Sequence, residues 1–221
     1  METMPASERT TIRRLPKRAA YDRTTIDAIL DEALHCHLGF TVDGQPYVIP
    51  TIHARVADRV YVHGSAASRM LRTLAGAVPA CLTVTLVDGL VLARSAFHHS
   101  MNYRSVVVLG TARTVVEPGE KLAALHAIVE HVVPGRWNEV RPPNERELKA
   151  TSVLSLPLAE ASAKLRTGGP LDDAEDLGLP CWAGVLPFTA MPGAPVPDEH
   201  VAPGTPPPSC VTGYRRPRYT A

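Results

Sequence analysis

Residues 59–69 read Arg-Val-Tyr-Val-His-Gly-Ser-Ala-Ala-Ser-Arg, a strand pattern that runs directly into a helix start. Alternating valines predict the strand, and the apolar spacing that follows predicts a helix over residues 65–75 with Ser65 as its N-cap. A helix N-terminus offers unpaired N–H groups and a partial positive charge, which suit a phosphate group. Ser68 and Arg69 add a hydroxyl and a guanidinium in the first turn. The stretch fits either a capped helix or a phosphate site, and the surrounding sequence decides between them.

The surrounding sequence is rich in short strands. Asp43-Gly44 is a two-residue turn signal between strands predicted over residues 36–42 and 45–54. Further strands are predicted over residues 59–63, 79–87, 90–93, 105–116 and 151–164, and helices over residues 24–34, 65–75 and 118–132. Six or so antiparallel strands with interspersed helices indicate a mainly β fold, a small closed or nearly closed β-barrel with α-helices, because closure removes exposed strand edges.

Composition divides the chain into four parts. Eleven of the 21 prolines lie at or beyond Pro170, which indicates a segment without regular secondary structure. Trp182 and Phe188 make the first part of this segment too apolar for a solvated tail, so it is expected to pack against the body or a partner. The predicted parts are a flexible N-terminal arm at residues 1–23, a barrel domain at residues 24–168, a packed strap at residues 169–194 and a disordered Pro-rich tail at residues 195–221.

Charge and cysteine usage exclude several classes of function. The 221 residues carry a formal net charge of +1, and no basic run precedes the last few residues, so a nucleic-acid partner is not expected. No apolar run approaches the roughly 20 residues of a membrane span. The four cysteines are scattered without a CxxC pair, which argues against a metal site and favours reduced thiols. The Arg13-Arg14 pair is not followed by an apolar core, so a cytoplasmic location is expected.

Three motifs occur in a fixed order along the chain. They are Gly-Phe-Thr-Val-Asp-Gly-Gln-Pro-Tyr-Val-Ile-Pro-Thr at residues 39–51, Val-Tyr-Val-His-Gly-Ser at residues 60–65 and Asn-Tyr-Arg-Ser-Val-Val-Val-Leu-Gly at residues 102–110. Together they resemble the pyridoxamine 5′-phosphate oxidase-related flavin-nucleotide-binding proteins, a group that includes the 5-nitroimidazole-resistance proteins. The resemblance covers about residues 24–190 and implies a six-stranded antiparallel split β-barrel of the FMN-binding type.

The resemblance also implies an FMN site at a homodimer interface. Ser65, Ser68 and Arg69 would take the phosphate, whose charge of about −1.5 to −2 suits these donors. Gly64 would let the main chain approach the ribityl region closely, because glycine has no side chain. The cofactor-binding residues implied are Ile49, Pro50, Thr51, His63, Gly64, Ser65, Ser68, Arg69, Tyr103, Arg104 and Ser105. On a strand Tyr103 and Ser105 share one face and Arg104 takes the other, so the three side chains reach one ligand only if the strand is bulged.

His98 and His99 are the candidate catalytic residues. They stand in a loop just before the third motif, where an imidazole could exchange a proton with a substrate on the open face of the flavin. The alternative is that both are solvated loop residues. His35 and His37 alternate along one strand face, and nothing in their spacing requires a metal ion.

The function expected from the resemblance is an FMN-dependent oxidoreductase that acts on a small organic substrate through flavin hydride transfer. A flavin-binding protein or sensor without turnover is the alternative, and a haem-binding or deazaflavin-binding split barrel is another. Pyridoxamine phosphate oxidation itself is not expected, because beyond Arg69 and Arg104 the sequence has no dense basic cluster for a second phosphate.

Overall fold

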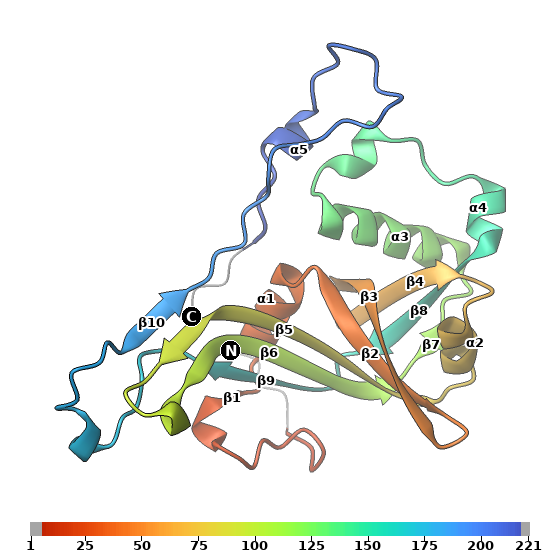
Figure 1. Cartoon of the computed structure of the whole chain (residues 1–221). Helices are drawn as coiled ribbons and strands as arrows, with labels where there is room; N and C mark the ends of the chain where they lie inside the picture. The colour runs from red at the N-terminus through yellow and green to blue at the C-terminus, as the bar shows by residue number, and fades with distance from the viewer. Residues whose placement is uncertain (1–5, 218–221) are drawn as a thin grey trace.

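The computed structural model describes residues 6–217 as an antiparallel β-barrel with a few helices (Figure 1). The strands of the 10-stranded sheet follow the order β1-β9-β6-β5-β2-β3-β4-β8-β7, and β10 pairs with β5. The strands are β1 (Ala19–Ala20), β2 (His35–Val42), β3 (Gln45–Val56), β4 (Arg59–Ser65), β5 (Pro79–Leu92), β6 (Ser100–Thr111), β7 (Arg113–Thr114), β8 (Thr151–Pro157), β9 (Glu160–Arg166) and β10 (Gly184–Pro187). The helices are α1 (Arg23–Glu32), α2 (Arg69–Ala75), α3 (Pro118–Val132), α4 (Glu145–Ala150) and α5 (Ser209–Thr212), with short 3-10 turns η1 (Pro16–Arg18), η2 (Ala96–His98), η3 (Arg136–Glu139) and η4 (Ala174–Asp176).

The barrel closes where the chain passes from β8 to β9. Only Leu158 and Ala159 separate these strands, yet β8 pairs with β4 and β9 pairs with β6. The two-residue link therefore brings the two ends of the sheet together around one aliphatic core. Helix α1 completes this core with Ile26 and Leu30, both fully buried. The mainly β split barrel predicted from the sequence is confirmed, with ten strands in place of six.

Strand pairing explains three of the differences between the predicted and the observed elements. Helix α2 begins at Arg69, four residues later than predicted, because β4 continues to Ser65, which pairs with Thr151. Asp88 makes a bulge within one continuous β5 in place of a turn between two strands, since β6 pairs along both sides of it. The single strand predicted over residues 151–164 is divided into β8 and β9 by the change of partner.

The predicted Asp43-Gly44 hairpin is confirmed. Both residues have positive φ, 50° at Asp43 and 79° at Gly44, as a type I′ turn requires. This turn sets the register in which Phe40 pairs with Tyr47.

Helix α3 covers the outer face of β3, β4 and β8 and encloses a second, smaller core. Its Ala124 and Ile128 pack on Ala54, Tyr61 and Val153 of these strands. The helix was predicted over residues 118–132, and the observed bounds agree with this range. Helix α4 was not predicted, although its N-cap Asn144 forms a capping box with Glu147.

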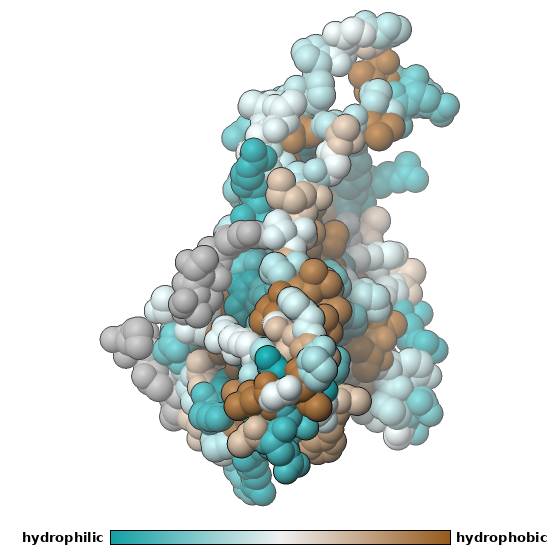
Figure 2. All heavy atoms as spheres, turned by 60° about the vertical axis from the view of Figure 1, so that its left-hand side comes forward, coloured by the Kyte–Doolittle hydropathy of each residue, from teal (hydrophilic) through white to brown (hydrophobic). Residues whose placement is uncertain are grey.

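Residues 169–194, the predicted strap, run along the outside of the barrel. Asp172 accepts hydrogen bonds from the backbone N–H and the Nη1 of Arg94, both at 2.8 Å. β10 then pairs with β5, where a Cβ at Gly89 would lie 2.7 Å from the Leu186 carbonyl oxygen, so only glycine allows this approach. Figure 2, with the β10 side turned forward, shows hydrophobic residues gathered on this surface. The exposed apolar side chains of the strap are Leu171, Leu177, Leu179, Trp182, Leu186, Phe188 and Met191.

Beyond the strap the chain crosses to α5 and returns to the barrel at Arg216 (Figure 1). The Arg216 guanidinium donates to the carbonyl oxygens of Asp31 and Glu32 at the end of α1, at 2.9 and 2.8 Å, and to that of His131 at the end of α3. The predicted division into arm, barrel, strap and disordered tail stays a prediction, and residues 1–5 and 218–221 of the arm and tail lie outside the described residues. No described helix is long and apolar enough to cross a membrane.

Candidate functional site: the split between β3 and β4

Strand β3 changes its neighbours half-way along its length. From Gln45 to Ile52 it pairs with β2 on one side, and from His53 to Val56 it pairs with β4. In the described part of the chain, no strand pairs with residues 45–52 on the side away from β2. Main-chain donors and acceptors therefore line one side of a split in the barrel. Ile49, Pro50 and Thr51, implied as cofactor-binding residues, lie on this free edge.

The opposite side of the split is formed by the end of β4 and the start of α2. Ser68 is the N-cap of α2, and its backbone N–H donates to the Ser65 carbonyl oxygen at 2.8 Å. The Arg69 guanidinium crosses the split and lies 4.5 Å from the ring centroid of Tyr47 on β3. The Ser65 hydroxyl accepts from the Ala67 N–H at 3.2 Å. Two hydroxyls and one guanidinium are thus grouped beside the free edge, although the helix begins later than predicted.

His63 lies at the same end of β4 with one ring nitrogen unused. Its Nδ1 is buried and has no hydrogen-bond partner among the described residues. Burial lowers the pKa of the ring, so the imidazole is neutral near pH 7. A neutral imidazole with a free nitrogen can accept a hydrogen bond or ligate a metal ion.

The outer face of β2, β3 and β4 carries three histidines and several exposed apolar side chains. Cross-strand pairing joins His35 with Ile52 and His37 with Pro50, and strand alternation puts His63 beside Ile52 on the same face. The rings of His35 and His37 are 5.4 Å apart between centroids. Ile52 is 38% exposed. This face combines imidazoles with exposed apolar side chains, and from the sequence only His35 and His37 were expected to share it.

Arg104 of the third motif is engaged in an ion-pair network inside the barrel wall. Its Nε donates to Asp88 at 2.9 Å, its Nη2 donates to Glu32 at 2.9 Å, and its Nη1 also pairs with Glu32. The hydrogen bonds from these two carboxylates raise the pKa of the guanidinium further. A guanidinium held by two carboxylates has no free charge for a phosphate, so the implied cofactor contact of Arg104 has no support in this chain.

Tyr103 and Ser105 are also separate from the split. Both lie on β6, and β5 and β2 stand between β6 and β3 in the sheet. Ser105 donates to the Lys164 carbonyl oxygen on β9 at 3.2 Å. Among the described residues, Tyr103 and Ser105 form no hydrogen bond with residues 65–69, and their implied role as cofactor contacts stays a prediction.

The candidate catalytic histidines lie at the far end of the β5–β6 ribbon. His98 Nε2 is 3.1 Å from Asp173 of the strap, and His99 Nδ1 is 3.0 Å from the Ser95 carbonyl oxygen. Helix α2 comes just before the first residue of β5, whereas His98 and His99 come after its last residue. The length of β5 therefore lies between α2 and these histidines. The structure therefore separates His98 and His99 from the split within one chain.

A match to a family model now identifies the fold class. The model described as pyridoxamine 5′-phosphate oxidase matches residues 22–165, which contain the whole split, strands β2 to β8 and most of β9. The chain therefore belongs to the pyridoxamine 5′-phosphate oxidase-related family of split β-barrels. A search of curated proteins returns no match to the chain.

Two solved structures are similar to nearly the whole of this chain, and a third is similar to part of it. The flavocytochrome Anf3 from Azotobacter vinelandii is 43% identical, over 96% of this chain and 99% of that one, with a TM-score of 0.89. The FAD and heme binding protein from Mycobacterium smegmatis is 38% identical, over 89% of this chain and 96% of that one, with a TM-score of 0.85. A candidate 5-nitroimidazole antibiotic resistance protein from Bacteroides thetaiotaomicron, 23% identical over 66% of this chain and 85% of that one, shares the fold with a TM-score of 0.53.

Proposed function

We propose that this protein is a redox protein that binds a flavin in the split between β3 and β4. The observation that supports the proposal most is that the free edge of β3 faces Arg69 and two serine hydroxyls on the other side of the split. A flavin needs both features, because its ring has a polar edge of donors and acceptors and its side chain ends in phosphate. The names of the two relatives that are 43% and 38% identical support a flavin as the ligand.

The flavin expected from the sequence is FMN, and this stays a prediction. One of these relatives is named for FAD, which makes FAD the second flavin to test. Either molecule presents a phosphate to Ser65, Ser68 and Arg69 through the same ribityl chain. Acid extraction of the purified protein followed by chromatography against FMN and FAD standards distinguishes the two.

Haem is proposed as a second cofactor, on the outer face beside the split. The observations that favour it are the imidazoles of His35, His37 and His63 on this face and the exposed apolar side chain of Ile52. A neutral imidazole is the usual protein ligand of haem iron, and the macrocycle requires a flat apolar surface. The names of the same two relatives support this cofactor.

The residues of the chain would position these groups and control access to them. When bound, a flavin supplies hydride and electron transfer, and a haem supplies one-electron transfer. Arg69 would neutralise phosphate charge, the β3 edge would fix the orientation of the ring, and His63 would act as a neutral ligand. An oxidoreductase acting on a small organic molecule is the activity proposed, and a carrier or sensor without turnover is the alternative.

A homodimer is proposed as the assembly. On the outer faces of β3 and β5, Val48 is 67% exposed and Val87 is 43% exposed, and Trp182 of the strap is 69% exposed. Exposed apolar side chains of this size favour a protein partner, and a twofold copy would bring a second β6 close to the split. Sedimentation of the cofactor-loaded protein tests this, and a loaded monomer at micromolar concentration would refute the dimer.

Absorption spectroscopy of the purified full-length protein tests the proposed cofactors. We expect flavin maxima that bleach on addition of a reduced nicotinamide nucleotide, together with a Soret band. His63→Ala should remove the Soret band and leave the flavin bound, whereas His200→Ala, an exposed control in the tail, should change neither. A protein that takes up no flavin after incubation with FMN and with FAD would overturn the proposal.

A further inference from the structure

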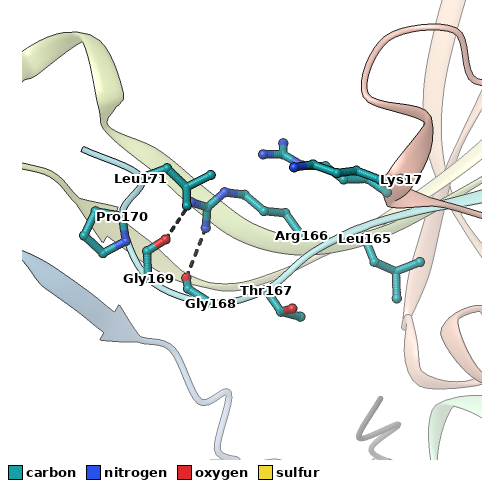
Figure 3. A pocket seen from close by; sticks show the side chains of 9 residues that line it. Lys17, Leu165, Arg166, Thr167, Gly168, Gly169, Pro170 and Leu171 are labelled. Carbon is teal, nitrogen blue, oxygen red and sulfur yellow. Dashed lines mark hydrogen bonds between the residues drawn. The ribbon is translucent and has the colours of Figure 1, made fainter. Parts of the chain in front are cut away.

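Arg166, the last residue of β9, is a buried arginine that has no carboxylate partner among the described residues. It is 6% exposed, and its donors point to neutral oxygens. Nη1 donates to the Gly168 carbonyl oxygen at 3.2 Å and to the Asn102 side chain, and Nη2 donates to the Gly169 carbonyl oxygen at 3.0 Å. Nε is buried without a partner among the described residues. Figure 3 shows the guanidinium reaching over the turn at Gly168 and Gly169.

The guanidinium borders an open cavity of about 310 Å³. The residues that line the cavity are Lys17, Arg18, Leu165, Arg166, Thr167, Gly168, Gly169, Pro170 and Leu171. Three of them are cations and none is an acid. Lys17 approaches from η1, on the side of the cavity opposite to the glycine turn (Figure 3).

The electrostatics of this cavity are unfavourable without an anion. Burial, and then the nearby charge of Arg18, lower the pKa of Arg166. Among the described residues, no carboxylate forms an ion pair with Lys17, Arg18 or Arg166. A buried charge without a counterion is costly, and a protein retains it at lower cost where a ligand supplies the opposite charge.

The turn beside Arg166 leaves room for such a ligand. Gly168 has φ +90°, and no heavy atom lies within 4 Å of a Cβ built at Gly168 or at Gly169. The volume of the cavity exceeds the roughly 30 Å³ of one water molecule about tenfold, which is enough for a phosphate or diphosphate group with part of its ester.

We propose that Lys17, Arg18 and Arg166 form an anion site that binds the phosphate or diphosphate group of a small molecule. Arginine guanidinium groups suit phosphate because they donate two parallel hydrogen bonds, and lysine adds a compact charge. None of the residues that line the cavity belongs to β3, β4 or α2, so within one chain this site is distinct from the split. The assignment does not depend on the flavin proposal.

Isothermal titration of the purified full-length protein with inorganic diphosphate tests the site. We expect saturable binding by the parent, weakened roughly tenfold or more in Arg18→Ala, because one charge-assisted hydrogen bond is lost. Arg14→Ala is the matched control, since this nearby arginine is exposed and does not line the cavity. Flavin content is measured in every sample, so that loss of flavin and loss of diphosphate binding are distinguished.

Two further measurements complete the test. Thermal midpoints show whether a loss of binding comes from poor folding, and a comparison of ADP with diphosphate shows which kind of molecule supplies the phosphate. Diphosphate should raise the thermal midpoint of the parent and not that of Arg166→Met, because only a binder of the folded state stabilises it. ADP binding more tightly than diphosphate would assign the site to a nucleotide, and equal binding would assign it to the free anion. The proposal is overturned if the parent binds neither compound, or if Arg18→Ala binds both as well as the parent.

Discussion

The guanidinium of Arg69 lies over the ring of Tyr47, 4.5 Å from its centroid, and so connects α2 to β3 across the split. A cation over an aromatic face is held by the ring quadrupole, at a gain of about 0.5–1 kcal/mol at exposed sites. The contact keeps a positive charge at the mouth of the split. Any phosphate that enters there meets a guanidinium already in position, which lowers the ordering cost of binding.

Replacement of Arg69 tests the proposed phosphate-binding site. We expect Arg69→Ala to weaken flavin binding by about 1.5–3 kcal/mol, the size of a hydrogen bond to a charged group. Flavin titration followed by fluorescence measures the loss. Arg72→Ala is the control, because Arg72 lies on the same short helix and is exposed. Equal affinities in the two variants would contradict the assignment.

Arg104 is expected to stabilise the fold and to leave flavin binding unchanged. Arg104→Met leaves Glu32 and Asp88 without their partner in a site where the Arg104 and Glu32 side chains are each 10% exposed. Removing one member of a buried ion-pair network costs about 3–5 kcal/mol. Chemical denaturation measures this cost.

A surface ion pair provides the control for Arg104. Arg113, whose side chain is 46% exposed, pairs with Glu120, and Arg113→Ala should cost less than about 1 kcal/mol. A comparable loss in both variants would mean that the Arg104 network contributes no more than a surface pair.

Buried histidines should make the protein less stable in acid. Burial, with the nearby charges of His131, Arg216 and His35, lowers the pKa of His53 to about 3, from 6.5. Between these values the unfolded chain binds a proton that the folded chain does not, so the free energy of unfolding falls as the pH drops below 6.5, by up to about 1.4 kcal/mol per pH unit. His53→Gln should flatten this slope in urea denaturation series, and His200→Gln should not. A slope unchanged in His53→Gln would assign the acid sensitivity to other groups.

Arg216 should stabilise the ends of two helices. It donates to carbonyl oxygens of Asp31, Glu32 and His131, where the helix dipole is negative. Arg216→Ala should lower the free energy of unfolding by about 1–2 kcal/mol. Arg215→Ala is the control, since its Nη1 donates only to the adjacent Tyr214 carbonyl oxygen.

The tail around Arg216 should otherwise be dispensable. Residues 195–221 have little apolar content to bury, so a chain truncated after Gly193 should stay folded and retain flavin, with a stability loss similar to that of Arg216→Ala. Circular dichroism and flavin absorbance of the truncated protein measure both properties. An insoluble or colourless product would show that the tail is structural.

His98 and His99 should have no effect on redox chemistry within one chain. Their partners are Asp173 and the Ser95 carbonyl oxygen, at the strand end remote from the split. The double alanine variant should reoxidise its flavin at the parent rate with quinone, nitro and aldehyde acceptors. Slower flavin reoxidation at unchanged flavin affinity would instead support a catalytic role for one of these histidines.

Much of the fold could be predicted from local patterns. The Asp43-Gly44 turn is fixed by positive φ, and α3 is fixed by its apolar spacing, so the turn and the helix were both predicted at the right residues. Asp88-Gly89 gave the same local signal as a hairpin, yet pairing with β6 makes it a bulge. Local chemistry is the same in the two cases, and only the distant partner strand distinguishes them.

The site was harder to predict because strand order decides which motifs meet. Arg69 and Tyr47 meet across the split, a contact that the sequence analysis did not name. Arg104 could not be assigned from its motif, since its carboxylate partners Glu32 and Asp88 are 72 and 16 positions away. The Arg166 cavity was missed for the same reason, because Lys17 and Arg18 reach it only through the pairing of β1 with β9.

The long reach of Arg216 has a consequence for synthesis on the ribosome. Helix α1 emerges well before Arg216, because the residue that binds the last carbonyl of the helix lies 184 positions later. β1 likewise cannot form its strand pairing until β9 has been synthesised. Between Arg166 and Arg216 about 50 residues must be translated, which takes roughly 3–10 s at about 5–20 residues per second. During that interval the nascent barrel exposes two uncapped helix ends, and chaperone contact or premature cleavage is expected there first.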